Sequence, residues 1–364
     1  MHVEHLSLKN FRNAVDSEIE FSKGVNVICG ANAAGKTNIL EAIFYLAAGK
    51  SFRNCKDREL ITFGCDKGSV AMRFFGNNAK IKMSATLSKS GRRVIKIGES
   101  APLRMTEYIG RFRAVIFTPD HLSLVKGSPE NRRRFLDLAI SQSFPRYAST
   151  LSEYNRVLAQ KNALLKRGNV IDGLLEVYNE KLASLAATIT VNRRKYIHRL
   201  EIEAKKFLAD MSNGKEDLAL GYQTQAGDLE TQEEIKERYI SLFSEKMQYE
   251  KDHFLSHYGA QKDDFSVVIN KKSARMYGSQ GQQRSAVLAL KLAEGELSAK
   301  LTGEYPVFLL DDVLSELDNK RREYILSGLK DRQTFITSCN EDDFKDIGNA
   351  VTYTVKQGEF GIRN

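Results

Sequence analysis

An eight-residue glycine loop constrains this chain more than any other feature. Its sequence is Gly30-Ala31-Asn32-Ala33-Ala34-Gly35-Lys36-Thr37, after the apolar run Val25–Cys29 and before a helical pattern over Asn38–Leu46. The loop fits the pattern GxxxxGK(S/T), in which glycines let successive backbone N–H groups face a phosphate. In such loops the lysine, here Lys36, reaches the β- and γ-phosphates, and the hydroxyl of Thr37 binds Mg²⁺. The flanking strand and helix favour a nucleotide site in an α/β sheet over a chance glycine turn.

A second motif has the composition of the usual partner of such a loop. The apolar strand predicted over Pro306–Leu310 is followed by two acids, Asp311 and Asp312. Carboxylates at a strand end can hold Mg²⁺ through water and can orient or deprotonate an attacking water molecule. Alone, the same residues would also fit a strand that ends in a solvated acidic turn. Beside the glycine loop, they predict a Mg²⁺ contact at Asp311 and a water contact at Asp312.

The charge of the chain indicates an anionic partner. Lysine and arginine number 55 against 46 aspartates and glutamates, a net charge of +9 over 364 residues. This charge suits nucleic acid or an anionic membrane surface, but it also fits a protein that is merely basic. No apolar run approaches the ~18 residues that span a bilayer, and the first residues lack the pattern of a secretory leader. The four cysteines form no CxxC pair, so we expect neither a zinc site nor disulfides, and a cytoplasmic location.

The hydrophobic pattern divides the chain into three regions. Short strand patterns alternate with turns over residues 1–127, and α/β alternation returns over residues 261–364. Between them, residues 128–260 repeat apolar side chains at three- and four-residue steps, which predicts amphipathic helices, the last over Glu233–His257. The first and third regions therefore predict one sheet domain, interrupted by a helical insertion that forms a small bundle or a short antiparallel arm.

Several segments resemble those of a known family. Tyr277–Arg284 is similar to the signature loop of ABC-type ATPases, and Asp311-Asp312 with Ser315–Asp318 is similar to their Walker B strand and D-loop. Four more segments, in this order along the chain, resemble one family within the ABC-type ATPases: Leu6–Asn13, Lys50–Arg53, Leu124–Pro129 and Arg132–Asp137. The chain thus resembles the RecF family of DNA replication and repair proteins over nearly its whole length, least over about residues 145–260.

The resemblance implies an ABC-type ATPase head, similar to the heads of SMC proteins without their long arms, with ATP held between two copies. Lys36, Thr37 and Asp311 of one copy would hold ATP and Mg²⁺, and Asp312 would be the catalytic carboxylate. The other copy would contribute Ser279, Gly281, Gln282 and, across the dimer interface, Asp318. The resemblance also implies ATP-dependent binding of double-stranded DNA near single-strand gaps, together with RecR and RecO in loading RecA.

The signature segment also has a meaning of its own. Ser279 and Gly281 precede a helical pattern over Gln282–Lys300. Backbone N–H groups at a helix start, with the Ser279 hydroxyl, can bind a phosphate presented by another molecule. An ordinary capped helix behind a glycine turn is the alternative.

Three positions depart from the general ABC pattern. Asp312 stands in place of the usual catalytic glutamate and is one methylene shorter, which predicts slow, switch-like hydrolysis. No glutamine occurs between residues 101 and 141, so Asp120 is the candidate substitute for the missing Q-loop residue. The switch histidine is replaced by Ser338, Cys339 and Asn340.

Two basic clusters are candidate contacts to DNA phosphates: Arg132, Arg133 and Arg134, and Arg193, Arg194 and Lys195. The first cluster crowds the start of a helix, where the macrodipole disfavours cations, so a DNA phosphate or an acidic side chain is expected nearby. Charge runs also occur as solvated helix faces. No aromatic residues interleave with either cluster, so the backbone of a duplex is favoured over a stacked single strand. Arg12 and Arg53 fit either a nucleotide or DNA contact or a structural ion pair.

Two other functions fit some of these motifs. A transporter-type ATPase subunit would need a membrane partner, and the missing glutamine and histidine count against it. A nuclease-linked ATPase would need an additional acidic metal site, for which the residues after Asn340 leave little room.

Overall fold

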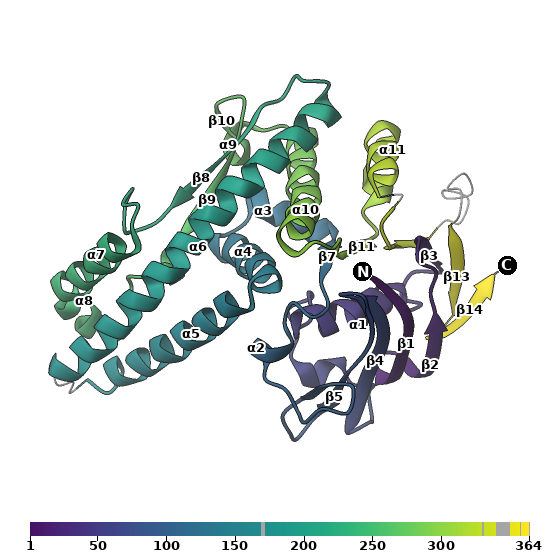
Figure 1. Ribbon diagram of the computed structural model, residues 1–364, viewed down its shortest axis with the longest axis horizontal. Helices are drawn as coiled ribbons and strands as arrows, with labels where there is room; N and C mark the ends of the chain where they lie inside the picture. The colour runs from purple at the N-terminus through teal and green to yellow at the C-terminus, as the bar shows by residue number, and fades with distance from the viewer. Residues whose placement is uncertain (169–171, 330, 340–349, 357, 364) are drawn as a thin grey trace. The chain divides into compact units, whose positions relative to one another are not determined.

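The computed structural model describes the chain except residues 169–171, 330, 340–349, 357 and 364. The chain forms two compact units (Figure 1). Residues Met1–His121 and Glu294–Asn364 make the first, and Leu122–Ala293 make the second. No helix among the described residues is long and apolar enough to cross a membrane. Both nucleotide motifs, at residues 30–37 and 311–312, fall in the first unit.

A six-stranded sheet carries these motifs. Its strand order is β14-β13-β3-β12-β11-β7, and every neighbouring pair is parallel except β13 with β14. The strands are β3 (Val25–Cys29), β7 (Ala114–Phe117), β11 (Val307–Asp311), β12 (Thr334–Ser338), β13 (Val351–Lys356) and β14 (Glu359–Arg363). Because parallel strands end at one edge, Cys29 lies opposite Ser338 and Asp311 lies opposite Thr337. The glycine loop and the two acids therefore start from the same edge of the sheet.

A five-stranded antiparallel sheet forms a second layer of the first unit, with strand order β2-β1-β4-β5-β6. Its strands are β1 (His2–Phe11), β2 (Ala14–Glu20), β4 (Lys67–Gly76), β5 (Ala79–Ser88) and β6 (Val94–Ile97). Helix α1 (Lys36–Ala48) contacts strands of both sheets, and 11 of its 13 residues are buried. A helix that is apolar on nearly all sides belongs in a core, so α1 anchors the end of the phosphate loop in the interior of this unit.

Short elements complete the first unit, and helices dominate the second. The first unit adds α2 (Met105–Tyr108), α11 (Asn319–Gly328) and 3-10 turns at Asp57–Leu60, Pro119–Leu122 and Leu314–Glu316. The second contains α3 (Ser123–Lys126), α4 (Pro129–Ser143), α5 (Pro145–Leu165), α6 (Asp172–Ser212), β8 (Leu218–Gln223), α7 (Gln232–Glu245), α8 (Met247–Asp252), a 3-10 turn at Ala260–Lys262, β9 (Asp264–Ile269), β10 (Lys272–Ser273) and α9 (Ala274–Tyr277). Helix α10 (Gln280–Thr302) begins in the second unit and ends in the first. The 41-residue helix α6 packs against α4, α5, α7 and β8.

The structure corrects two expectations for the middle of the chain. The helix predicted over Glu233–His257 is two helices, α7 and α8, separated at Lys246 and ending at Asp252. The chain leaves the helix there because buried Glu250 accepts hydrogen bonds from the Ser256 hydroxyl (2.9 Å) and the His257 backbone N–H (2.9 Å).

The second correction concerns the boundary predicted between residues 260 and 261. Strand β9 pairs with β8, and β8 was not expected from the sequence. Because β8 belongs to the helical unit, this pairing joins residues after 260 to that unit. Residues 261–293, including the signature segment, therefore belong to the second unit rather than to the sheet domain.

Candidate nucleotide site

The phosphate loop has the backbone that its glycines allow. Gly35 precedes α1 with φ 116°, a conformation that side chains rarely adopt, and a Cβ there would lie 2.8 Å from Asn13 Oδ1. A Cβ on Gly30 would lie 2.5 Å from the carbonyl oxygen of Val355 on β13. The loop is also held from outside, because Asn13 Nδ2 and the Gly358 N–H both donate to the carbonyl of Ala34. The turns after β1 and β13 thus shape the loop.

Lys36 lies at the centre of the loop and is 8% exposed. Its ammonium donates to the carbonyls of Gly30 (2.7 Å) and Ala31 (3.1 Å), and it lies 3.3 Å from Cys339 Sγ. These bonds fold the side chain over the loop, where a phosphate held by the loop N–H groups would meet the ammonium. That Lys36 reaches the β- and γ-phosphates stays a prediction.

Thr37 and Asp311, the two residues predicted to hold Mg²⁺, are joined by a hydrogen bond. The Thr37 hydroxyl donates to Asp311 Oδ1 at 2.7 Å, and the Thr337 hydroxyl donates to the same oxygen at 2.9 Å. Burial raises the pKa of Asp311 above the ordinary aspartate value, and the two hydroxyl donors only partly oppose this shift. A hydroxyl and a carboxylate are oxygen ligands that Mg²⁺ prefers, so the donor set fits this ion.

Asp312 has a different environment from its neighbour. It is exposed and has φ +53°, in the left-handed region that aspartate tolerates better than longer side chains. Its backbone N–H donates to Thr337 Oγ1 at 2.9 Å, and Ser315 Oγ donates to its carbonyl at 2.9 Å. The turn presents the Asp312 carboxylate to the open side of the strand end, where a water molecule can reach it.

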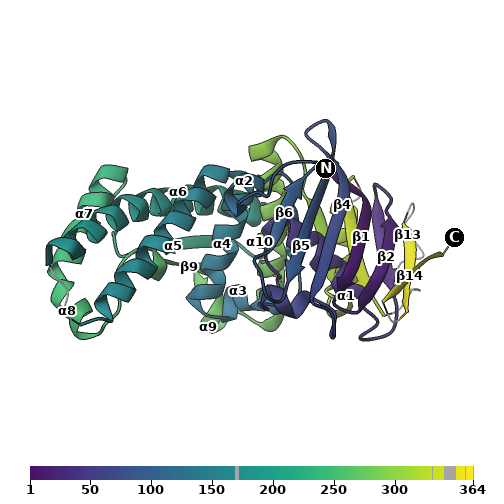
Figure 2. The same cartoon turned by 90° about the horizontal axis from the view of Figure 1, so that it is seen from below.

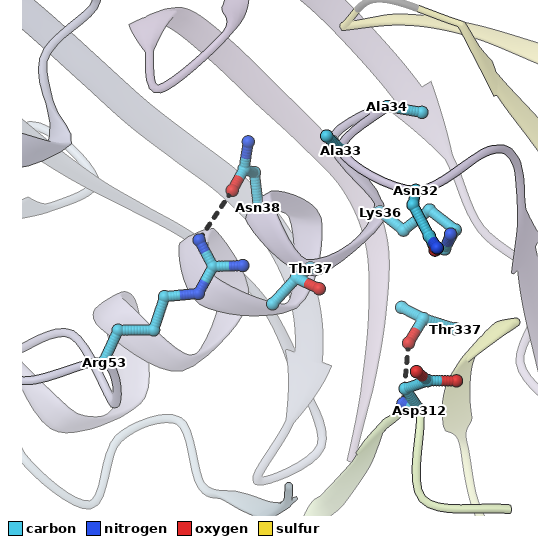
Figure 3. Close-up of a pocket in the computed structure, with 10 residues that line it drawn as sticks. Asn32, Ala33, Ala34, Lys36, Thr37, Asn38, Arg53, Asp312 and Thr337 are labelled. Carbon is cyan, nitrogen blue, oxygen red and sulfur yellow. Dashed lines mark hydrogen bonds between the residues drawn. The ribbon is translucent and has the colours of Figure 1, made fainter. Parts of the chain in front are cut away.

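A cavity of about 280 Å³ lies between the loop and the strand end (Figure 3). It is lined by Asn32, Ala33, Ala34, Gly35, Lys36, Thr37, Asn38, Arg53, Asp312 and Thr337. All of these residues belong to the first unit. The loop N–H groups, the lysine and the carboxylate face one space, which suits a phosphate chain.

Arg53 lines the cavity. From the sequence, it could contact a nucleotide or DNA, or it could form a structural ion pair. Its Nη1 lies 3.1 Å from Asn38 Oδ1 and 3.6 Å from Glu41 Oε2 (Figure 3 shows the Asn38 bond). Glu41 is fully buried on α1, and its carboxylate also accepts from Arg12 Nε (2.8 Å) and Ser51 Oγ (2.5 Å). Arg12 therefore forms a structural ion pair with Glu41. Arg53 also pairs with Glu41, and in addition it lines the cavity. Glu41 itself was missed, because a lone glutamate in an apolar helix carries no motif.

The signature residues lie in the second unit. Ser279 caps α10: its hydroxyl accepts from the Gln282 N–H (3.2 Å), and Gln282 Oε1 accepts from the Ser279 N–H (2.9 Å). Gly281 is in the first turn of the same helix. In the first unit, Asp318 caps α11 by accepting from the Arg321 N–H at 2.9 Å, and this bond lowers the pKa of Asp318. Whether these residues touch nucleotide stays a prediction.

The other two departures from the ABC pattern, at the Q-loop and at the switch position, have different surroundings. Asp120 lies in the 3-10 turn Pro119–Leu122 and is absent from the lining of the described cavity. At the switch position, Cys339 Sγ contacts Asn32 Oδ1 (2.9 Å) and Lys36, while Ser338 ends β12. Asn340 lies outside the described residues.

The chain is similar to known proteins over nearly its whole length. Residues 2–361 match the family model "RecF/RecN/SMC N terminal domain". The chain is 38% identical to the DNA replication and repair protein RecF of Halalkalibacterium halodurans over 98% of each chain, and 39% identical to RecF of Staphylococcus aureus over 99% of each. The chain belongs to the RecF family.

Solved structures agree with this assignment. A RecF structure, described as the recombination mediator protein RecF with ATP in the RecFOR pathway, superposes with a TM-score of 0.93 at 35% identity, covering 100% of this chain and 98% of the other. An Smc head domain derived from Pyrococcus furiosus superposes with a TM-score of 0.57 at 18% identity, covering 100% and 96%. This RecF-family chain therefore has the ABC-type ATPase head fold predicted from its motifs.

The structure overturns two predicted DNA contacts of this RecF-family chain. Arg132 is 4% exposed, and its Nε and Nη2 donate to the two carboxylate oxygens of Asp264 at 2.6 and 2.8 Å. Arg193 is 2% exposed and pairs with Asp137 (2.9 Å) and Asp263 (3.3 Å). The anion expected beside the first cluster is thus an acidic side chain. Both arginines stabilise the interior of the second unit and are unavailable to DNA.

The other members of the two clusters differ in exposure. Arg133 donates to the carbonyl of Asp263 at 2.9 Å, and Arg194 donates to the carbonyls of Gly227 (2.9 Å) and Leu229. Arg134 is half-buried, and its pKa is lowered by burial. Lys195 is exposed. Arg133, Arg134, Arg194 and Lys195 stay predictions as DNA contacts.

Proposed function

We propose that this RecF-family chain is an ATPase that binds DNA in an ATP-dependent manner during recombinational repair. The observation that carries the proposal is the phosphate site, in which Lys36, Thr37 and Asp312 line one cavity and Thr37 donates a hydrogen bond to the neighbouring Asp311. ATP would lie in the loop, and Thr37 and Asp311 would hold Mg²⁺. The ion would neutralise charge on the β- and γ-phosphates and polarise the γ-phosphate for attack.

We propose that hydrolysis is slow and acts as a switch. Asp312 would orient the attacking water, and its short side chain reaches less far than the usual glutamate. Slow hydrolysis suits a protein that must hold DNA for a time and then release it.

We propose that a second copy completes the site. The described cavity is lined by the first unit alone, and the signature residues lie in the second unit. Ser279, Gly281 and Gln282 of the other copy would meet the γ-phosphate, and Asp318 would lie across the interface. Such an arrangement makes ATP the link between two heads, which would close as a clamp on double-stranded DNA.

The cellular role is proposed from the relatives. Curated relatives bear the name DNA replication and repair protein RecF, and solved RecF structures are described as parts of the RecFOR pathway. We propose that this chain acts in the cytoplasm, binds gapped duplexes, and cooperates with RecR and RecO to help load RecA. Its family membership favours this role over the transporter and nuclease alternatives.

The test is the solution mass of the Asp312→Asn protein, with and without ATP and Mg²⁺, repeated with a gapped duplex. The substitution should slow hydrolysis while leaving Lys36 and Thr37 to bind ATP. We expect a shift from 41.1 kDa to a dimer on adding ATP, together with tighter, salt-sensitive DNA binding. Lys36→Met is the control, because it should remain monomeric. An Asp312→Asn protein that binds ATP but stays monomeric and ignores DNA would refute the proposal.

A further inference from the structure

One segment of the first unit carries most of the net charge of the chain. Residues 67–97 contain five lysines and three arginines and no aspartate or glutamate, a formal charge of +8 against +9 for the whole chain. This segment comprises β4, β5, β6 and their turns. The basic balance of the protein is therefore concentrated in this segment: five of its cations lie on the three strands, and Lys89, Arg92 and Arg93 lie in the turn between β5 and β6.

The register of the sheet decides where these charges point. On β5, Met83, Ala85 and Leu87 are buried, so the alternate residues between them face outward. Arg73 lies opposite Lys82, and Ser84 lies opposite Lys96. Both pairs share the outward face of the sheet. Figure 2 looks onto the five strands that form it.

The outward positions of β4 to β6 combine cations with small hydroxyl side chains. The members of this basic face are Ser69, Ala71, Arg73, Lys80, Lys82, Ser84, Thr86 and Lys96, and the register places Lys67, Ser88 and the apolar Phe75 and Val94 around them. Lys82 and Lys96 are exposed, and the side chains of Arg73 and Lys80 are 52% and 73% exposed. Short side chains between the lysines leave room for a close approach by a flat or convex polyanion.

Most carboxylates near this face lie on the edge strand β2, and one, Glu4 on β1, reaches the basic face at Lys80. Asp16, Glu18 and Glu20 on β2 lie opposite Lys9, Ser7 and His5 of β1. Glu18 pairs with His5 at 2.6 Å, whereas the nearest approach of Glu20 to Arg73 is 3.9 Å. On β1, Glu4 lies 3.3 Å from Lys80. Among the described contacts, Lys82 and Lys96 have no carboxylate partner, so their charges are the ones available to a ligand.

We propose that the basic face binds the phosphate backbone of duplex DNA. This inference rests on the proposed function and adds a surface to it. Arg73 and Lys82 are direct cross-strand neighbours, whose Cβ atoms lie about 5 Å apart in such a pairing. Lys82 and Lys96 are diagonal neighbours, and residues so placed are about 7–8 Å apart. Phosphates follow each other about every 3.4 Å along the axis of one DNA strand, so the face spans a few consecutive phosphates. Ser84 and Thr86 add hydroxyl donors for phosphate oxygens.

This surface implies binding that does not depend on base sequence. The face is a sheet surface with short side chains between its cations, and phosphate contacts position a protein without reading bases. The acidic edge at β2 would repel the backbone and so orient the duplex along β4 to β6. The basic face also replaces Arg132 and Arg193, which are buried in ion pairs.

The experiment compares two double variants of equal net charge, each measured for DNA binding against salt concentration with ATP and Mg²⁺. Lys82→Gln/Lys96→Gln removes two charges of the basic face. Lys181→Gln/Lys236→Gln is the control, because each of these lysines already pairs with a glutamate at 2.9 Å on exposed helix surface. We expect the first variant to bind duplex DNA roughly tenfold more weakly and to lower the salt slope by about 1.8. The control should match the wild type, and ATP should bind all three proteins equally.

A gain-of-charge variant makes the test independent of folding defects. Ser84→Lys adds a cation between Lys82 and Lys96, and we expect it to tighten DNA binding and raise the salt slope by about 0.9. If the wild type binds DNA with ATP but all variants share its affinity and slope, the basic face is overturned while the proposed function stands. If the wild type itself does not bind DNA with ATP, the proposed function fails and the basic face with it.

Discussion

The hydroxyl of Thr37 donates a 2.7 Å hydrogen bond to Oδ1 of Asp311, a residue 274 positions later in the chain. Thr337 donates to the same oxygen, so one buried carboxylate joins the phosphate loop, β11 and β12. No motif states that two hydroxyls share one oxygen. These two bonds connect the residues of the proposed Mg²⁺ site to each other and to both strands.

Replacing Asp311 by asparagine should raise the stability of the protein while weakening its ATP binding. Burial raises the folded-state pKa of Asp311, so the folded chain holds this proton more tightly than the unfolded chain, and stability falls as pH rises through the folded pKa. Asp311→Asn keeps an oxygen for Thr37 and Thr337 but cannot ionise. We expect a higher Tm than wild type at pH 7, with the difference shrinking as pH falls to the ordinary aspartate range.

The same variant should lose Mg²⁺-dependent ATP binding by more than about tenfold, because a neutral amide is a weaker ligand for the ion. Calorimetric titration with and without Mg²⁺ measures this loss. A variant that binds ATP and Mg²⁺ like the wild type would remove Asp311 from the metal site.

Asp312→Glu should not speed hydrolysis, because the backbone strain of glutamate at this position would offset the greater reach of its side chain. The residue has φ +53°, where a longer side chain costs about 1–2 kcal/mol, and aspartate is among the few residues that adopt this conformation readily. We expect phosphate release no faster than wild type and a lower Tm. Asp312→Asn is the control for backbone strain, because asparagine tolerates the same conformation. Faster phosphate release by Asp312→Glu would show that the greater reach of the side chain outweighs the backbone strain.

Gly35→Ala should damage the phosphate loop through both strain and collision. The backbone has φ +116°, and the added Cβ would lie 2.8 Å from Asn13 Oδ1. We expect ATP affinity to fall more than tenfold, because the N–H groups that face the phosphate would be displaced. Gly64→Ala is the matched control: it has φ +87° with no neighbour within 4 Å, so it carries strain without collision. It should leave ATP binding unchanged in a fluorescent-nucleotide titration.

Adding Asn13→Ala to Gly35→Ala distinguishes the effect of backbone strain on ATP affinity from the effect of the collision with Asn13. The double variant removes the collision but keeps the strain, and Asn13→Ala alone measures the cost of losing the Asn13 bond to the Ala34 carbonyl. Gly35→Ala should therefore lower ATP affinity less in the Asn13→Ala background than in the wild type. An equal loss in both backgrounds would show that backbone strain alone accounts for the effect of Gly35→Ala.

Arg193→Ala should destabilise the second unit. The substitution would leave the carboxylates of Asp137 and Asp263 without their shared cation, at a cost of about 3–5 kcal/mol. Burial already raises the pKa of Asp263, so we expect the loss to be smaller at pH 5 than at pH 8, as the unpaired carboxylate takes up a proton. Urea unfolding at the two pH values measures it. Lys195→Ala, two residues away and exposed, should change stability by less than about 0.5 kcal/mol.

The site could be predicted from sequence where local patterns carry the chemistry. The glycine loop and the paired acids each follow a short apolar strand, and a phosphate loop works through backbone N–H groups that the glycines themselves permit. Parallel strands place their carboxyl ends at one edge, so the meeting of Thr37 with Asp311 followed from the two motifs. The α/β sheet with a helical insertion followed from the alternation of hydrophobic periods.

Tertiary structure alone decided which cations are buried and which are free. Arg132 and Arg193 look like surface charges in sequence, yet each meets carboxylates that are 56 or more positions away in the chain. Strand β8 was missed because its pairing with β9 stabilises it more than its own short, glycine-containing sequence does. Glu41 and Asn13 support the loop through contacts between distant segments. A charge acquires its role from the partners that folding brings to it, and those partners are set by packing and register rather than by neighbours in the chain.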